Sequence, residues 1–156
     1  MSISPYTKGA PKSTLTAKPT GNADAPNLKT DLKFLKRKVD AGAKFLVTQM
    51  FFDNKAYFDF VKNCRDLGIN IPIIPGIKPI TKKSQIMQLP KIFNISIPED
   101  LTEAIDKCKT DQEVEQVGIE WCIGQCKELM QAKAPVLHFY TMGKSKIISA
   151  IAKEIF

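Results

Sequence analysis

The sequence VTQMFFDNK, residues 47–55, decides how this chain folds. It continues the apolar, β-prone run that starts at Phe45, so a strand ends near Gln49, and Asp53 is suited to capping the helix that follows. A strand that leads directly into a helix is typical of parallel α/β folds, in which ligands bind at the carboxyl ends of the strands. The Gln49 amide can donate and accept hydrogen bonds at once, which suits the edge of a heterocycle. An amide satisfied by the backbone at a sheet edge is the alternative, and the spacing alone leaves both open.

Helices and strands alternate along the rest of the chain. An apolar stripe from Leu28 predicts a helix that Gly42 ends, and a second stripe that begins at Asp53 ends at Gly68. Further helices are expected over residues 82–89, 98–109 and 144–155, and a long helix is expected to begin at residue 110 and to include the apolar residues up to Met130. Strands are expected over residues 45–49, 69–74 and 136–140, and Pro75-Gly76 is expected to close the second of them. Because short turns join alternating strands and helices, the sheet is expected to be parallel.

Three strands are too few for a complete fold of this kind. A closed barrel needs about eight strands, and an open parallel sheet needs both faces covered and its edges protected. The chain therefore looks like the back part of a larger α/β fold. Residues 1–25 are rich in Ser, Thr, Pro, Lys and Gly without a sustained period, and we expect them to form a disordered or divergent arm before a folded portion at 26–156.

The composition narrows the class of protein. Lys and Arg number 23 against 16 Asp and Glu, a formal charge of +7 that is spread along the chain. No basic segment interleaved with aromatic residues supports nucleic-acid binding, and no apolar run is long enough to span a membrane. The four cysteines show no CxxC spacing, which favours reduced thiols in a cytoplasmic protein. Because His138 is the only histidine, we expect no zinc site.

Four segments identify a family that the chain resembles. They are DLKFLKRKVDAGA (31–43), TQMFFD (48–53), IIPGIKPI (73–80) and HFYTM (138–142). Together they closely resemble methylenetetrahydrofolate reductases, in unbroken order from about residue 25 to the C-terminus. The resemblance implies part of a TIM (β/α)8 barrel that binds FAD, takes a hydride from NADH or NADPH, and reduces 5,10-methylenetetrahydrofolate to 5-methyltetrahydrofolate. By position, the first predicted helix corresponds to the fifth helix of that barrel.

The resemblance assigns FAD contacts to residues of that helix: Asp31, Phe34, Arg37 and Lys38. The two cations suit a pyrophosphate or a reduced flavin, and the carboxylate suits ribose hydroxyls. Phe34 stands where some relatives have Asn, so backbone contact or stacking is all that we expect from it. Without the family, a solvated helix face with charges at helical spacing is the alternative.

The resemblance also places residues at the folate substrate: Gln49, Gln85, Leu89 and Lys144. Gln49 matches a glutamine that touches both pterin and nicotinamide, and Gln85 matches a second folate-contacting glutamine. Leu89 replaces a Phe that packs on the folate or nicotinamide, and Lys144 replaces a basic residue suited to the glutamate tail. A lysine that simply begins a helix is the alternative for Lys144. His138 and Tyr140, on one face of the last predicted strand, are expected to pack and not to catalyse.

The chain also departs from the family. The resemblance places the first five strands, and with them the catalytic glutamate, before the matching region, and no acidic residue here can be assigned that role. We therefore expect no reductase activity from these 156 residues alone, and we expect a partner, either a second copy or a complementary N-terminal half. A non-catalytic half barrel that binds flavin or folate is the alternative function.

Overall fold

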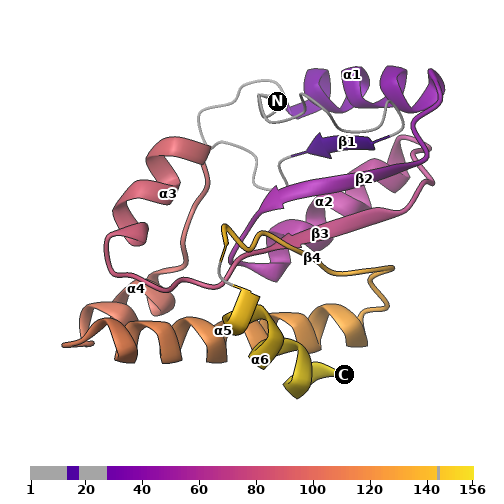
Figure 1. The fold of residues 1–156 in the computed structure, drawn as a ribbon. Coiled ribbons are helices and arrows are strands. Elements are labelled where there is room, and N and C mark those ends of the chain that lie inside the picture. Colours follow the sequence, from indigo (N-terminus) through magenta and orange to yellow (C-terminus); the bar gives the residue numbers. More distant parts are fainter. Residues whose placement is uncertain (1–13, 18–27, 144) are drawn as a thin grey trace.

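The computed structural model of the chain describes residues 14–17, 28–143 and 145–156. Four parallel strands form one sheet, in the order in which they occur in the chain: β1 (Thr14–Ala17), β2 (Phe45–Met50), β3 (Ile73–Ile77) and β4 (His138–Phe139). Parallel neighbours require a crossover connection, and a helix lies in each one (Figure 1). The predicted partial parallel sheet is confirmed, with one strand more than the sequence indicates.

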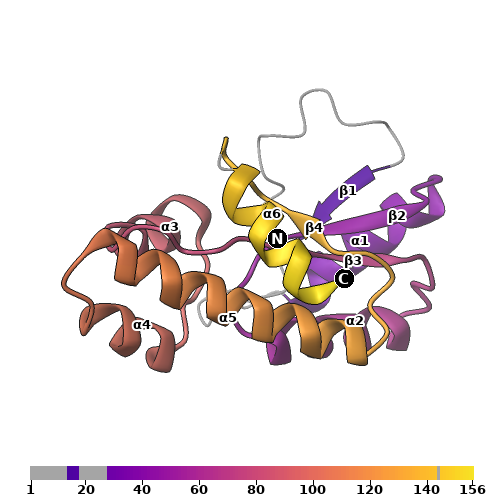
Figure 2. The same ribbon diagram turned by 60° about the horizontal axis from the view of Figure 1, so that its bottom comes forward.

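Six helices complete the described fold: α1 (Leu28–Asp40), α2 (Asn54–Asp66), α3 (Gln85–Phe93), α4 (Glu99–Asp106), α5 (Asp111–Gln131) and α6 (Ser145–Ile155). The main apolar cluster joins β2 and β3 to α1, α2, α5 and α6. A second apolar cluster lies among α3, α4 and the first half of α5. Both views place α3 and α4 together at the end of the sheet toward which the strand arrows point (Figures 1 and 2).

The strand β1 corrects the expectation that residues 1–25 lack secondary structure. Thr14 pairs with Phe45 and Ala17 pairs with Thr48, so β1 covers an edge of β2 that would otherwise leave its backbone groups unpaired. Local composition did not reveal it because a strand of four residues depends on its neighbour for stability. The rest of the expected arm lies outside the described residues, and the boundary at residue 26 stays a prediction.

The strand β3 begins later than the predicted strand over 69–74. The backbone N–H of Ile69 donates to the carbonyl of Cys64 at 2.9 Å, and the Arg65 guanidinium donates to the carbonyl of Ile71 at 3.1 Å. The first bond satisfies a carbonyl group in the last turn of α2, and the second satisfies a carbonyl group in the segment that follows the helix. Pairing with β2 therefore starts only at Ile73.

Pro75 and Gly76 lie inside β3, whereas the sequence predicts that they close it. Pro75 has no N–H to donate to the neighbouring strand. The register moves from Val47 opposite Ile74 to Met50 opposite Gly76, so β2 has one residue more than β3 across this stretch. This is a β-bulge, and it lies at the carboxyl end of β2, where the sequence predicts a ligand site.

Gly76 occupies a position where no side chain fits. Its N–H donates to the Thr48 hydroxyl at 2.8 Å. A Cβ atom on Gly76 would lie 2.4 Å from the carbonyl oxygen of Thr48 and 2.7 Å from a ring carbon of Tyr140. The backbones of β2 and β3 can therefore approach this closely only because residue 76 is glycine.

We predict that Gly76→Ala destabilises the chain by about 2 to 3 kcal/mol, because the added methyl group must displace backbone. The matched control is Gly124→Ala in α5, where a Cβ meets nothing within 4 Å and where replacing a helical glycine stabilises by up to about 1 kcal/mol. Urea unfolding of both variants measures the difference. Equal stabilities would contradict the steric argument.

The buried Tyr57 hydroxyl makes the free energy of unfolding depend on pH in the alkaline range. Its hydroxyl donates to the carbonyl of Ile73 at 2.7 Å, and burial raises the pKa of Tyr57 to about 12, against a smaller opposing effect of Arg65. The unfolded tyrosine ionises near its ordinary pKa of 10.0, while the folded one stays protonated. Stability is therefore fully present below pH 10 and decreases as pH rises toward 12.

At about 1.4 kcal/mol per pH unit, Tyr57 accounts for roughly 2 to 3 kcal/mol of that loss. Cys64 and Tyr140, whose pKa values burial also raises, add to it. We expect Tyr57→Phe to lower stability at neutral pH and to flatten the alkaline decline, measured by urea unfolding across this range. An unchanged slope in the variant would refute the assignment.

Candidate folate and flavin site

Gln49 lies in the bulge near the carboxyl end of β2, as the sequence predicts. Its side chain is 4% exposed, and its oxygen accepts a hydrogen bond of 3.3 Å from the backbone N–H of Met50. The backbone thus holds the oxygen of the amide, and the amide NH2 is the part suited to donate to a ligand. The strand-end position is confirmed, while its contact with pterin or nicotinamide stays a prediction.

Gln85 is the first residue of α3, on the connection that leaves the carboxyl end of β3. Its side-chain oxygen accepts from the backbone N–H groups of Thr81 at 2.7 Å and Lys82 at 3.2 Å. These bonds stabilise a turn over the residues before it, so α3 begins at Gln85 and not at residue 82 as predicted. As in Gln49, the backbone occupies the side-chain oxygen, so the NH2 group is the part of the amide that is suited to donate to a ligand.

Of the other two predicted folate residues, the structure describes Leu89 but not Lys144. Leu89 is 4% exposed and belongs to the second apolar cluster, which also contains Met50, the neighbour of Gln49. Leu89 is therefore a packed core residue, with little surface for stacking on a ligand. Lys144 lies outside the described residues, so its role stays a prediction.

Tyr140 connects the segment after β4 to the bulge that carries Gln49. The sequence indicates this role only in part. Its hydroxyl donates to the Thr48 carbonyl at 2.9 Å, and its ring meets that of His138 edge to face, with ring centres 4.8 Å apart. Burial raises the pKa of Tyr140, so the hydroxyl stays protonated and able to donate. The expected packing role is therefore accompanied by a hydrogen bond to the bulge beside Gln49. The signal in the sequence is the glycine at 76, which leaves room for the ring.

The four predicted FAD residues form one stripe along α1: Asp31, Phe34, Arg37 and Lys38. The Arg37 guanidinium lies over the exposed Phe34 ring, 5.6 Å from its centre. At about 1.5 Å per residue the stripe is roughly 10 Å long. Two cations near one end and a carboxylate near the other fit an elongated dinucleotide better than a compact ligand.

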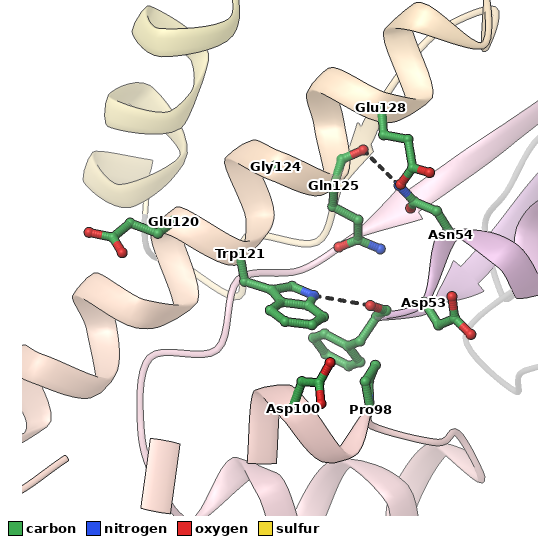
Figure 3. A pocket seen from close by; sticks show the side chains of 10 residues that line it. Asp53, Asn54, Pro98, Asp100, Glu120, Trp121, Gly124, Gln125 and Glu128 are labelled. Carbon is green, nitrogen blue, oxygen red and sulfur yellow. Dashed lines mark hydrogen bonds between the residues drawn. The ribbon is translucent and has the colours of Figure 1, made fainter. Parts of the chain in front are cut away.

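The described cavity lies elsewhere, and the sequence does not indicate it. It has a volume of about 560 Å³ and opens between the start of α2, the start of α4 and the middle of α5 (Figure 3). None of the seven predicted site residues that the structure describes lines it. Its walls include Trp121, whose indole N–H donates to the Phe52 carbonyl at 3.0 Å.

The chain matches the family model described as methylenetetrahydrofolate reductase over residues 10–155. The chain belongs to this family. The match starts earlier than the resemblance indicated, so it includes β1. It is 40% identical over 139 residues to a probable NADPH-dependent methylenetetrahydrofolate reductase of Caenorhabditis elegans, covering 88% of this chain and 21% of that protein.

Two further relatives of the reductase family give the same result. Identity is 39% over 127 residues with the NADH-dependent methylenetetrahydrofolate reductase 1 of Zea mays, covering 81% of this chain and 21% of that protein. It is 36% over 138 residues with the 5,10-methylenetetrahydrofolate reductase of Buchnera aphidicola, covering 88% of this chain and 47% of that protein. The chain thus spans about a fifth of the nematode and maize proteins and just under half of the Buchnera one.

A solved structure supports the fold. An uncharacterized protein from Clostridium thermocellum, described as binding two copies of 5-methyl-5,6,7,8-tetrahydrofolic acid, superposes with a TM-score of 0.63 at 19% identity. The match covers 90% of this chain and 51% of that one. The fold is therefore a partial (β/α)8 barrel. Among the described residues, no helix is long and apolar enough to cross a membrane.

We predict that Tyr140→Phe loosens the bulge that carries Gln49, because the Thr48 carbonyl loses its donor, at a cost of about 1 to 2 kcal/mol. Hydrogen exchange at the Gly76 and Met50 amides should accelerate. The control Tyr57→Phe removes a comparable bond to Ile73, and we expect a similar loss of stability from it without local acceleration at the bulge. Equal exchange in the two variants would contradict a specific role for Tyr140.

Proposed function

We propose that this chain forms the flavin- and folate-contacting half of a methylenetetrahydrofolate reductase barrel. The reaction is FAD-mediated hydride transfer from NADH or NADPH to 5,10-methylenetetrahydrofolate. The observation that carries the proposal is the family match over residues 10–155 together with the position of Gln49 in the bulge at the carboxyl end of β2. That end of a parallel strand is where barrel enzymes bind their ligands.

The stripe of Asp31, Phe34, Arg37 and Lys38 on α1 is the proposed support for FAD. Arg37 and Lys38 supply positive charge for the pyrophosphate, Phe34 with the guanidinium above it supplies a flat surface, and Asp31 accepts from hydroxyl groups of a ribose. Bound flavin supplies the hydride transfer chemistry. The proposed role of α1 is limited to binding and orienting the cofactor.

The two glutamines are the proposed contacts for the folate. In each, backbone N–H groups hold the side-chain oxygen, so rotation of the amide is restricted and the NH2 group is fixed in direction. Two such donors can orient the acceptor atoms along the edge of a pterin. Leu89 packs in the second apolar cluster, which supports α3, and we assign Lys144 to the glutamate tail on the resemblance alone.

The chain requires further β/α units for catalysis. Its four parallel strands are half of the number that closes a barrel. We propose that a second set of four units, from a complementary N-terminal half, pairs with the edges β1 and β4 and supplies the missing acid. Another copy of this chain could cover the same edges, but it carries no residue assigned to that role. The isolated chain is expected to bind flavin or folate weakly and to show no turnover.

A chimera tests the assigned roles. We propose to join the N-terminal β/α units of the Buchnera reductase to this chain, and to measure FAD content and the folate half-reaction separately. Gln49→Ala should slow the folate half-reaction by about tenfold or more through the loss of one or two hydrogen bonds, with FAD content unchanged. Arg37→Ala and Lys38→Ala should do the reverse and reduce FAD content.

The matched controls are Gln131→Ala at the exposed end of α5 and Lys44→Ala after α1, which remove an amide and a cation away from the site. We expect both to behave as the parent chimera does. If Gln49→Ala lowers FAD content and folate reduction equally, its assignment to the folate is wrong. A chimera that retains flavin without any turnover would favour the non-catalytic binding module.

A further inference from the structure

Three residues of α5 contact main-chain carbonyl groups in the two loops that neighbour the proposed folate residues. They are Gly118, Trp121 and Gln125, whose spacing of three and four places them on one face of the helix. The first loop joins β2 to α2 and starts two residues after Gln49, and the second joins β3 to α3 and ends just before Gln85. Because a barrel binds its ligands at such loops, α5 supports the part of the fold on which the site depends.

The helix holds the first loop by hydrogen bonds. The Gln125 amide donates to the Phe51 carbonyl at 2.9 Å, and the Trp121 indole donates to the Phe52 carbonyl at 3.0 Å. Figure 3 shows the Trp121 side chain extending from α5 toward this loop, with the bond drawn. In the opposite direction, the Asn54 amide donates to the Gln125 main-chain carbonyl at 3.0 Å. Donors from α5 therefore satisfy buried carbonyl groups that lie outside strands and helices.

The second loop lies directly against the helix at Gly118. A Cβ atom on this residue would lie 1.8 Å from the carbonyl oxygen of Ile80 and 2.7 Å from its carbonyl carbon. The backbone of the loop can therefore reach α5 only where the helix has a glycine. The next residue of the loop, Thr81, donates from its N–H to the Gln85 side chain at 2.7 Å. The contact at Gly118 thus fixes the turn that holds the Gln85 amide.

Apolar packing joins these contacts into one unit. Met50 and Phe52 at the first loop and Ile80 in the second are buried in the second apolar cluster, together with Val114 of α5. Interiors packed at this density leave little room for independent movement. A shift of the first half of α5 therefore has to displace both loops.

We propose that the three contact residues of α5 are positioning residues for folate binding. Through the two loops, α5 sets the directions of the Gln49 and Gln85 amides without touching the ligand itself. This inference rests on the proposed function, because it takes the two glutamines as folate contacts. The contacts described above involve no residue of α1, so flavin binding at the proposed FAD stripe does not depend on them.

Removal of the two donors tests the proposal. Trp121→Phe removes the indole N–H and keeps an aromatic ring, and Gln125→Met removes the amide and keeps an unbranched side chain. We propose to titrate the full chain with 5-methyltetrahydrofolate and, separately, with FAD by isothermal titration calorimetry, at a temperature where circular dichroism shows every variant folded. The double variant should bind the folate about tenfold more weakly, because small displacements of hydrogen-bonding groups have large effects, and should bind FAD as the parent does.

The matched control for the amide is Gln116→Met, on the exposed side of the same helix, where the side chain bonds to Glu120. We expect it to bind both ligands as the parent does. A role limited to general stability would affect the two ligands equally, so the difference between folate and FAD binding is the decisive readout.

Gly118→Ala tests the second loop, with Gly124→Ala as its control on the same helix, where a Cβ meets nothing within 4 Å. The methyl group at residue 118 has to push the loop away. It should therefore accelerate hydrogen exchange at the Thr81 and Lys82 amides and weaken folate binding, and the control should do neither. The donor-removed double variant keeps the test decisive if Gly118→Ala does not fold.

The inference alone is overturned if the parent chain binds 5-methyltetrahydrofolate and the double variant binds it as tightly. It is also overturned if the double variant loses FAD binding to the same extent as folate binding. If the parent binds no 5-methyltetrahydrofolate, or if Gln49→Ala leaves that binding unchanged, the proposed function is wrong and this inference is wrong with it.

Discussion

The close approach of Gly76 to Thr48 is the constraint on which the candidate site depends. Pro75 cannot donate to β2, and the Gly76 N–H reaches the Thr48 hydroxyl in place of a regular ladder bond. The extra residue of β2 then forms the bulge that contains Gln49. Tyr140, the residue after β4, completes the arrangement through its bond to the Thr48 carbonyl. Three strands thus meet at the point where the glutamine amide is held, because no side chain at residue 76 separates them.

The two apolar clusters divide the molecule into a supporting part and a site-bearing part. The main cluster anchors the sheet to α1, α2, α5 and α6, as in a barrel, where helices cover the outside of the strands. The second cluster lies beyond the carboxyl ends of the strands and holds α3, with Gln85 and Leu89, against the start of α5. Residues of the site therefore sit on packed elements, which restricts their directions.

Charge is distributed as unevenly as the packing. The basic residues of α1 form a stripe that suits an anionic cofactor, whereas the cavity at the start of α2 collects carboxylates without basic partners among the described residues. A net charge of +7 describes neither surface. Binding by this chain therefore depends on local fields, which fall off within about 10 Å at moderate salt.

The sequence by itself determined the alternation of strands and helices, the start of α2 at the Asp53 cap and the burial of Leu32 and Leu35, because each follows from a local periodic or capping pattern. It also carried the family motifs that locate Gln49 and the stripe on α1. Only the tertiary structure decided β1, the late start of β3, the bulge and the acidic cavity. Each of these is made by residues that meet through folding, such as Asn54 and Glu128, which are 74 positions apart. A pattern along the chain records what a residue does to its near neighbours, and it holds no signal for a contact that exists only after distant elements pack.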